Sequence, residues 1–172
     1  MKRNSILLGV LSMFIACEKT GICKDDELQF QRAAYTGNQL NTDGFYYGDV
    51  DSSSSLPFAN IYYFYRDGTF FTSASEDLEK AESGNIDVDV SNEFGKTIKS
   101  AWGVFRINSN EIEIARWESS LHGCENSILE RGIIINDSTF ILEPNSSVRS
   151  QESIFRFHPL VQKPDSTNSF IQ

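Results

Sequence analysis

Hydrophobic and polar residues alternate over short distances in much of the chain after residue 44. Apolar and acidic residues alternate one by one in 86–90, and two isoleucines alternate with two glutamates in 111–114. A period of two is typical of a β-strand with one buried face. The sequence therefore predicts strands, not helices, for this region.

Turn residues separate these short runs. Asp67-Gly68 lies between two aromatic runs, and Asn108-Ser109-Asn110 and Asn136-Asp137 lie between aliphatic ones. Asp-Gly is a strong hairpin signal, because glycine adopts a positive φ without steric cost. We therefore expect about eight or nine strands. The predicted strands are 45–47, 58–65, 69–72, 86–90, 101–107, 111–117, 128–135, 139–142 and 153–157.

Consecutive strands without long helices between them favour an antiparallel meander. We expect an all-β fold in which about eight strands form an up-and-down barrel over residues 44–160. A barrel of that size either holds a small ligand or is filled by its own side chains. The sequence leaves both states open.

The two flanks of the barrel region have other patterns. Residues 26–34 carry a few apolar positions beside the acidic run Asp25-Asp26-Glu27. Acidic residues stabilise the first turn of a helix, so we expect a short N-terminal helix there. The last residues, 161–172, are polar and include a proline, and we expect a flexible tail.

The first 17 residues have the pattern of an export signal. Lys2 and Arg3 precede an apolar run from residue 6 to residue 16, as in secretory signal peptides. The run ends on Phe14-Ile15-Ala16-Cys17, which resembles the lipobox of bacterial lipoproteins, with Phe14 in place of the usual leucine. The resemblance implies removal of the signal peptide 1–16 and attachment of acyl chains such as palmitate to Cys17. Residues 17–43 are then a lipidated tether that includes the short helix.

The acidic run that follows the lipidation site indicates where the protein is sent. Lys24-Asp25-Asp26-Glu27 resembles the sorting signals that send some Gram-negative lipoproteins outward. The resemblance implies the bacterial cell envelope, with the outer membrane as the destination and the lipid as the membrane contact. No apolar run after Cys17 approaches the ~20 residues that cross a bilayer, so we expect the rest of the chain to lie in the aqueous phase.

The chain is strongly acidic. Once Lys2 and Arg3 are removed, 13 of the 15 basic residues remain against 24 acidic ones, a formal charge of −11. Phosphate backbones repel such a polyanion, so we expect no nucleic-acid partner. Solubility alone is an alternative reason for the charge.

Three cysteines need an assignment. If lipid occupies Cys17, then Cys23 and Cys124 remain as a pair in an oxidising compartment, where thiols form disulfides. The sequence therefore predicts a Cys23–Cys124 bond, with two unpaired thiols as the alternative. The cysteines and the two histidines lack the spacing of a zinc site, so we expect no metal.

A series of short motifs resembles the lipocalin-like, or calycin-type, domains of small Gram-negative lipoproteins. In those domains an Asp-Gly hairpin, a Trp-Gly strand and a late hairpin mark successive strands of an up-and-down barrel. The Gly-x-Trp motif of animal lipocalins is missing, so the resemblance implies the fold and transfers no ligand. The motifs lie at 64–70, 102–105, 111–114, 132–135, 137–140 and 155–157.

Aromatic residues are the remaining functional signal. Tyr and Trp combine a large apolar face with a polar tip, which suits a barrel mouth or a recognition surface, and core packing is the alternative. No nucleophile motif or phosphate-binding loop is present, so we expect no catalytic residue and no cofactor. The first hypothesis is an envelope-anchored protein that binds a small apolar or amphipathic ligand. The second is a non-catalytic structural lipoprotein whose filled barrel contacts another envelope protein. The candidate ligand-binding residues are Tyr47, Tyr63, Tyr65, Trp102 and Trp117.

Overall fold

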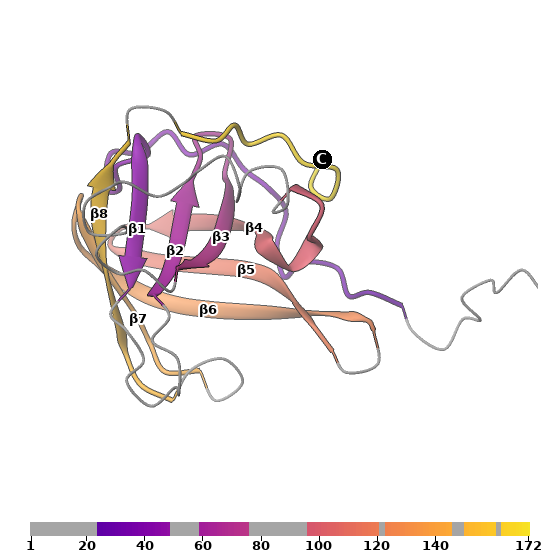
Figure 1. Ribbon diagram of the computed structural model, residues 1–172. Helices are drawn as coiled ribbons and strands as arrows, with labels where there is room; N and C mark the ends of the chain where they lie inside the picture. The colour runs from indigo at the N-terminus through magenta and orange to yellow at the C-terminus, as the bar shows by residue number, and fades with distance from the viewer. Residues whose placement is uncertain (1–23, 49–58, 76–95, 121–122, 146–149, 161–162) are drawn as a thin grey trace, which may run out of the picture.

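Eight antiparallel strands close into a barrel in the computed structural model of the protein, which describes residues 24–48, 59–75, 96–120, 123–145, 150–160 and 163–172 (Figure 1). Each strand pairs with its neighbours in sequence, and β1 and β8 complete the ring. The predicted all-β up-and-down barrel is therefore confirmed. The strands are β1 (Gly44–Gly48), β2 (Ala59–Phe64), β3 (Thr69–Ser75), β4 (Trp102–Asn108), β5 (Glu111–Ser119), β6 (Glu125–Asn136), β7 (Thr139–Leu142) and β8 (Ser153–Pro159), with a 3-10 turn, η1 (Lys99–Ala101), before β4.

The predicted hairpins join consecutive strands. Asp67 and Gly68 connect β2 to β3, and the Asp67 carboxylate accepts hydrogen bonds from the Thr69 backbone N–H and hydroxyl at 2.9 and 2.6 Å. Ser109, at φ 58°, connects β4 to β5. The strand predicted at 86–90 lies outside the described residues. Among the described residues, no helix is long and apolar enough to cross a membrane.

Alternate residues of the strands build two separate hydrophobic clusters. The interior cluster receives side chains from all eight strands and from the segment before β1. Its buried members are Tyr35, Leu40, Tyr46, Tyr62, Phe64, Phe70, Phe105, Ile112, Ile114, Ile134, Phe140, Leu142 and Phe155. The outer cluster lies on the opposite faces, and its buried members are Phe45, Ile61, Tyr63, Tyr65, Phe71, Trp102, Val104, Ala115, Trp117 and Ile171.

The predicted N-terminal helix is wrong. Residues 24–34 contain no helix and run as an extended segment, here called the strap, across the outside of the barrel (Figure 1). The Asp26 N–H donates to the Glu125 carbonyl at 2.9 Å, not to a carbonyl in a helical turn of its own. Leu28 and Phe30 both pack against the outer cluster. Their spacing of two fits an extended chain, in which alternate side chains share a face.

The strap passes directly over the β2–β3 hairpin. Gly68 has a φ of 87°, and a Cβ placed there would lie 1.9 Å from the carbonyl oxygen of Ala33. Tyr35 follows the strap, donates its N–H to the Arg66 carbonyl at 2.9 Å and enters the interior cluster. Leu40 also enters this cluster, so the chain before β1 contributes to the barrel core.

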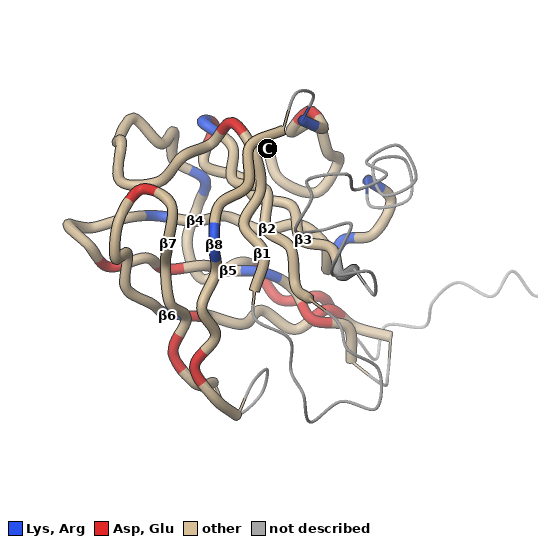
Figure 2. The backbone as a smooth tube through the Cα atoms, turned by 60° about the vertical axis from the view of Figure 1, so that its left-hand side comes forward, with Lys and Arg blue, Asp and Glu red and all other residues tan. Residues whose placement is uncertain are grey.

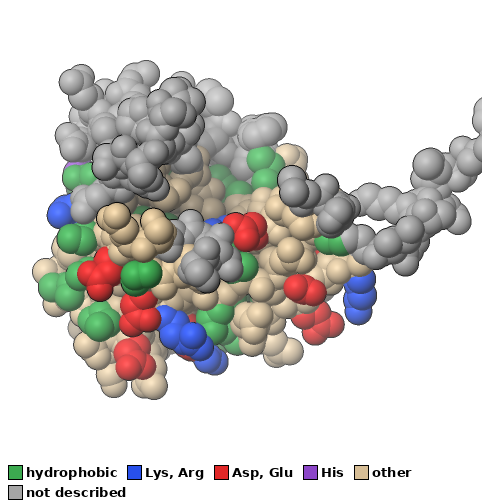
Figure 3. All heavy atoms as spheres, turned by 90° about the horizontal axis from the view of Figure 1, so that it is seen from below, with side chains coloured by type: hydrophobic (Ala, Val, Ile, Leu, Met, Phe, Trp, Pro, Cys, Tyr) green, Lys and Arg blue, Asp and Glu red, His purple; other side chains and the backbone are tan. Residues whose placement is uncertain are grey.

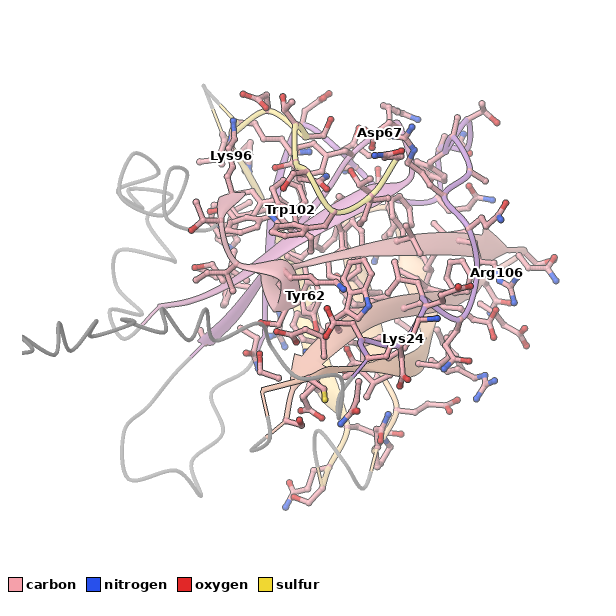
Figure 4. All side chains as sticks on the ribbon, turned by 90° about the vertical axis from the view of Figure 1, so that its right-hand side faces the viewer. Lys24, Tyr62, Asp67, Lys96, Trp102 and Arg106 are labelled. Atoms are coloured by element: carbon pink, nitrogen blue, oxygen red, sulfur yellow. The ribbon has the colours of Figure 1, made fainter. Side chains whose placement is uncertain are left out.

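The C-terminal residues 163–172, for which the sequence predicts a flexible tail, have defined contacts in the structure. The Lys163 ammonium donates to the carbonyls of Thr42 and Phe64. Lys96 pairs with Asp165 at 2.8 Å, and Figure 4 shows Lys96 beside this C-terminal segment. Ile171 is buried in the outer cluster. The N-terminal strap and the C-terminal segment therefore both pack on the outer cluster.

Candidate functional site

Aromatic rings pack the middle of the barrel. The Phe64 ring has its centroid 4.8 Å from that of Phe105 and 5.6 Å from those of Tyr46 and Phe140. Phe140 in turn stacks on Phe155 at 4.8 Å. These separations are typical of rings in direct contact. Of the two states that the sequence leaves open, the contacts support the filled interior.

The polar atoms of the interior tyrosines have partners at the ends of the barrel. The Tyr46 hydroxyl donates to the Asp137 carbonyl at 2.7 Å. The Tyr62 hydroxyl donates to Glu130 at 3.4 Å, and the buried Glu130 carboxylate also accepts from the Arg116 guanidinium at 3.0 Å. Buried polar groups with partners avoid the cost of desolvation without compensation, so these groups are compatible with a structural core.

All five candidate ligand-binding residues lie outside the barrel interior. Four are buried members of the outer cluster, and Tyr47 packs against it. In Figure 4, Trp102 lies beneath the C-terminal segment, whereas Tyr62 lies deeper in the barrel. The structure therefore brings the predicted residues together on the outer side of the wall. Their role in binding stays a prediction.

Two hydroxyls of the outer cluster differ from those of the interior. The Tyr63 and Tyr65 hydroxyls are buried and have no hydrogen-bond partner. Burial raises the pKa of Tyr63 to about 12. The Lys163 ammonium lies 4.0 Å above the centre of the Tyr65 ring, and burial lowers the pKa of Lys163 to about 8. The cation therefore contacts the face of this ring.

A cleft of about 540 Å³ lies between the strap and the rest of the outer layer. Val104 of β4 and Trp117 of β5 contribute its apolar floor, the strap forms one wall, and Lys99 with residues 170–172 completes the lining. Ligand sites of small molecules commonly have volumes of about 300–1,000 Å³. The lining residues are Asp25, Asp26, Glu27, Leu28, Phe30, Gln31, Arg32, Lys99, Val104, Trp117, Phe170, Ile171 and Gln172.

Trp117 is fixed in the cleft by polar contacts on both sides. Its indole N–H donates to the Asp26 carbonyl at 2.8 Å. The Lys99 ammonium lies 4.4 Å from the ring centre and 2.8 Å from the Asp25 carboxylate. A cation over an indole face is attracted by the negative face of the ring. The ring is therefore held in one orientation, with charged groups around it.

The charges at the cleft are unequal. Its lining contains three carboxylates, those of Asp25, Asp26 and Glu27, and two cations, Arg32 and Lys99. Lys99 pairs with Asp25, and Arg32 lies 3.7 Å from the Asp67 carboxylate. Glu27 makes no ion pair in the part of the chain that the structure describes. The charge left at the rim is therefore negative.

Sequence reasoning found only Trp117 among the residues of the cleft. It missed Leu28 and Phe30 because the strap was interpreted as a helix. The spacing of two residues between them is typical of an extended segment and could have indicated one. Phe170 and Ile171 form an apolar pair inside a polar tail, which was a second signal. Nothing in the sequence indicates that Lys99 lies over Trp117, because this contact depends on the strand register.

The predicted cysteine chemistry falls partly outside the described residues. Cys17 and Cys23 lie there, so lipidation and the Cys23–Cys124 bond stay predictions. Cys124 is half-buried and immediately precedes β6. Within the described ranges, no group of three or more His, Cys, Asp or Glu is arranged to hold a metal ion.

Comparison with known proteins identifies no relative of the chain. The closed eight-stranded antiparallel barrel is compatible with a lipocalin-like fold. No protein-family model, no curated protein and no solved structure matches the chain.

Proposed function

We propose that the protein is a lipid-anchored protein of the bacterial envelope that binds a small amphipathic ligand in the cleft under the strap. The leader and the lipobox-like motif at Cys17 support the anchor. The cleft, with Trp117 in its floor and charged groups at its rim, is the observation that supports binding. Because aromatic rings fill the interior, we place the proposed site on the outer face of the barrel and not in its lumen.

The rim defines the preferred ligand chemistry. Trp117 and Val104 offer an apolar surface to a chain or ring, and the charge left at Glu27 favours a cationic head group. The lining contains no Ser, Thr, Cys, His or Tyr, so it lacks the usual nucleophiles and general bases other than its carboxylates and Lys99. Binding without turnover is therefore the activity that we propose.

Fluorescence of Trp117 tests this site. The chain has two tryptophans, so Trp102→Phe leaves Trp117 as the single emitter. We expect dodecylamine, below its micelle concentration, to change this emission with saturation, and dodecanoate to bind more weakly. Glu27→Gln should reduce the preference for the amine, because it removes a carboxylate that has no ion pair among the described residues.

The control for this titration lies on the opposite face. Ile135→Ser alters an exposed residue of β6 and should leave the response unchanged. Calorimetric titration of the unsubstituted chain repeats the measurement without a tryptophan variant. Absence of saturable binding for both probes in both measurements would rule out the proposed site.

The anchor is tested separately. Metabolic labelling with an alkyne analogue of palmitate should label the wild-type chain and not Cys17→Ser. The variant should also keep its leader, because cleavage of lipoprotein precursors follows lipidation. A labelled Cys17→Ser protein, or an unlabelled wild type, would contradict the anchor.

The second candidate is contact with another envelope protein. It is favoured by a row of isoleucines on the outer side of β6, β7 and β8, here called the bare face. Ile133 on β6 pairs with Ile141 on β7, which pairs with Ile154 on β8. Ile133 and the nearby Ile135 are 43% and 57% exposed, and no other large hydrophobic residue in the described part of the chain is classed as exposed. Figure 3 shows hydrophobic side chains among acidic ones on this side of the molecule.

The charges beside the isoleucines define the partner. Arg106 and Arg131 both bind Glu113, at 2.6 and 3.2 Å, so one of their two positive charges is balanced by this carboxylate. Glu111 lies directly across from Ile133. In Figure 2 acidic positions mark the chain near the ends of β7 and β8, and β8 itself carries one basic residue, Arg156. This face fits a protein surface with apolar residues flanked by Lys or Arg.

Model peptides distinguish this candidate from the first. A helical Leu/Lys peptide should bind the protein, and its Leu/Glu counterpart should not. The double change Ile133→Ser and Ile135→Ser should weaken the Leu/Lys peptide about tenfold, whereas Glu27→Gln should have no effect. Equal binding by the double variant, or concentration-dependent dimerisation in sedimentation, would contradict a basic partner at this face.

A further inference from the structure

We propose that a Cys23–Cys124 disulfide clasps the strap to β6 and so holds one wall of the cleft in place. The parts that concern the cleft, the envelope oxidant and the lipid on Cys17 rest on the proposed function, whereas the register that brings the strap beside β6 does not.

The strap runs beside the start of β6 in the same direction. The Glu125 N–H donates to the Asp25 carboxylate at 3.0 Å, and the Ser127 N–H donates to the Asp26 carboxylate at 3.1 Å. Further along, the Gln29 amide reaches the Ser127 carbonyl at 3.5 Å. Higher strap numbers therefore meet higher β6 numbers, which makes the two segments parallel.

This parallel arrangement places the residues that follow the two cysteines in the sequence side by side. Cys23 precedes Asp25 by two residues, and Cys124 precedes Glu125 by one. Two residues of extended chain span at most about 7 Å. A disulfide joins Cα atoms about 4.4–6.8 Å apart. The register thus supports the pairing independently of the cysteine count.

Cys124 occupies a turn that fixes its backbone. Its N–H donates to the Ser120 hydroxyl at 3.2 Å, and its carbonyl accepts from the Ser120 N–H at 2.8 Å. Cys124 is disulfide-bonded in the structure. The remaining cysteines are Cys17, which the lipobox-like motif assigns to lipid, and Cys23.

The bond needs an oxidant, which an envelope thiol–disulfide oxidoreductase supplies. The two thiols lose two protons and two electrons as the S–S bond forms, and the disulfide of the oxidoreductase is reduced to a dithiol. Once formed, the bond fixes the chain two residues before Asp25. Since Asp25 to Leu28 and Phe30 to Arg32 line the cleft, the position of this wall then depends on the bond.

Peptide mapping of the full chain under non-reducing conditions tests the bond. Trypsin cuts after Lys19 and Lys24, which places Cys23 in the peptide 20–24, apart from Cys17. It also cuts after Arg116 and Arg131, which places Cys124 in the peptide 117–131. We expect these two peptides to be joined and to separate on reduction. Two free thiols, or a link from Cys124 to Cys17, would overturn the proposal.

Hydrogen exchange tests the clasp without any ligand. In Cys23→Ser and in the reduced wild type, the amides of Glu125 and Ser127 should exchange at least tenfold faster, because their acceptors lie on the strap. Cys17→Ser, the matched control, should keep the wild-type rates. Unchanged exchange in Cys23→Ser would overturn the clasp even if the bond exists.

Dodecylamine titration then tests the effect on the cleft. We expect at least tenfold weaker binding in Cys23→Ser and wild-type affinity in Cys17→Ser. Equal affinity in Cys23→Ser would overturn the role of the bond at the cleft. If the oxidised wild type itself fails to bind, the proposed function and this role fail together, while peptide mapping and hydrogen exchange still decide the bond and the clasp.

Discussion

The interior and outer clusters are both rich in aromatic residues, yet they differ in how they are closed. The interior is enclosed by the eight strands, and its tyrosine hydroxyls reach partners such as the Asp137 carbonyl. The outer cluster is covered by the strap and the C-terminal segment, and the hydroxyls of Tyr63 and Tyr65 have no partner. A cleft of about 540 Å³ lies between the strap and the rest of the outer layer. Aromatic content alone therefore does not locate a binding site; the way the cluster is covered does.

Truncation of the interior should have the largest effect. Phe64 is fully buried and contacts five aromatic rings, so Phe64→Ala should lower the free energy of unfolding by about 3–5 kcal/mol. Phe71→Ala in the outer cluster should cost less, because this cluster is covered by the strap and the C-terminal segment, which can repack more easily than the paired strands of the barrel. Urea denaturation measures both. A larger loss for Phe71→Ala would reverse the ranking of the two layers.

The crossing of strap and hairpin should be nearly as sensitive. Gly68→Ala puts a Cβ against the Ala33 carbonyl at a φ of 87°. We expect a loss of about 2–4 kcal/mol, part of which is the cost of a left-handed conformation. Gly123→Ala is the matched control, because its φ is also positive, at 79°, but nothing lies within 4 Å of its Cβ. Similar losses for both variants would show that the strap does not press on the hairpin.

Lys163 makes the cover of the outer cluster sensitive to pH. Burial lowers its pKa from 10.5 to about 8, so between these values the folded protein binds fewer protons than the unfolded chain. The free energy of unfolding should therefore rise with pH in this window, by about 1–2 kcal/mol. Urea denaturation from pH 7.5 to 9.5 measures this, and Lys163→Met should lack the rise. A fall with pH that depends on Lys163 would contradict the assignment.

Removal of a tyrosine hydroxyl should lower the stability of the protein in the interior cluster but not in the outer cluster. Tyr46→Phe loses the bond to the Asp137 carbonyl and should cost about 1 kcal/mol. Tyr63→Phe removes a buried hydroxyl without a partner and should be neutral or stabilising. Thermal denaturation of the two variants, run in parallel, makes the comparison. A loss for Tyr63→Phe as large as that for Tyr46→Phe would mean that its hydroxyl is satisfied in solution.

The bare face should matter least for stability. Ile133→Ser and Ile135→Ser each alter an exposed side chain, so each should change the free energy of unfolding by less than about 0.5 kcal/mol. Chemical denaturation is again the measurement. A substantial loss would indicate that this face is covered in the folded protein.

The sequence predicted the barrel because its strands are encoded locally. The alternation at 111–114 and the Asp67-Gly68 turn specify β5 and the β2–β3 hairpin without knowledge of distant residues. The strap was mispredicted because its three acidic residues resemble a helix start, whereas its actual partners, Glu125 and Ser127, lie about a hundred residues away. Long-range partners of this kind leave no periodic signal in the strap itself.

The candidate site was less predictable for the same reason. Trp117 could be singled out as a large aromatic residue, but its cleft is assembled from the strap, η1, two strands and the C-terminal residues. Whether an aromatic residue faces the interior or the outer side depends on strand register. The sequence therefore identified a plausible set of side chains and could not assign their side of the wall.

The pairing of β1 with β8 has a consequence for the order of assembly. It joins residues as distant as Gly44 and Pro159, whereas every other ladder joins neighbouring strands. As the chain is synthesised from its N-terminus, β1 emerges early and keeps one unpaired edge until the last strand arrives. Exposed strand edges attract other chains. We therefore expect the new chain to be prone to association through the edge of β1 until this final seam is made.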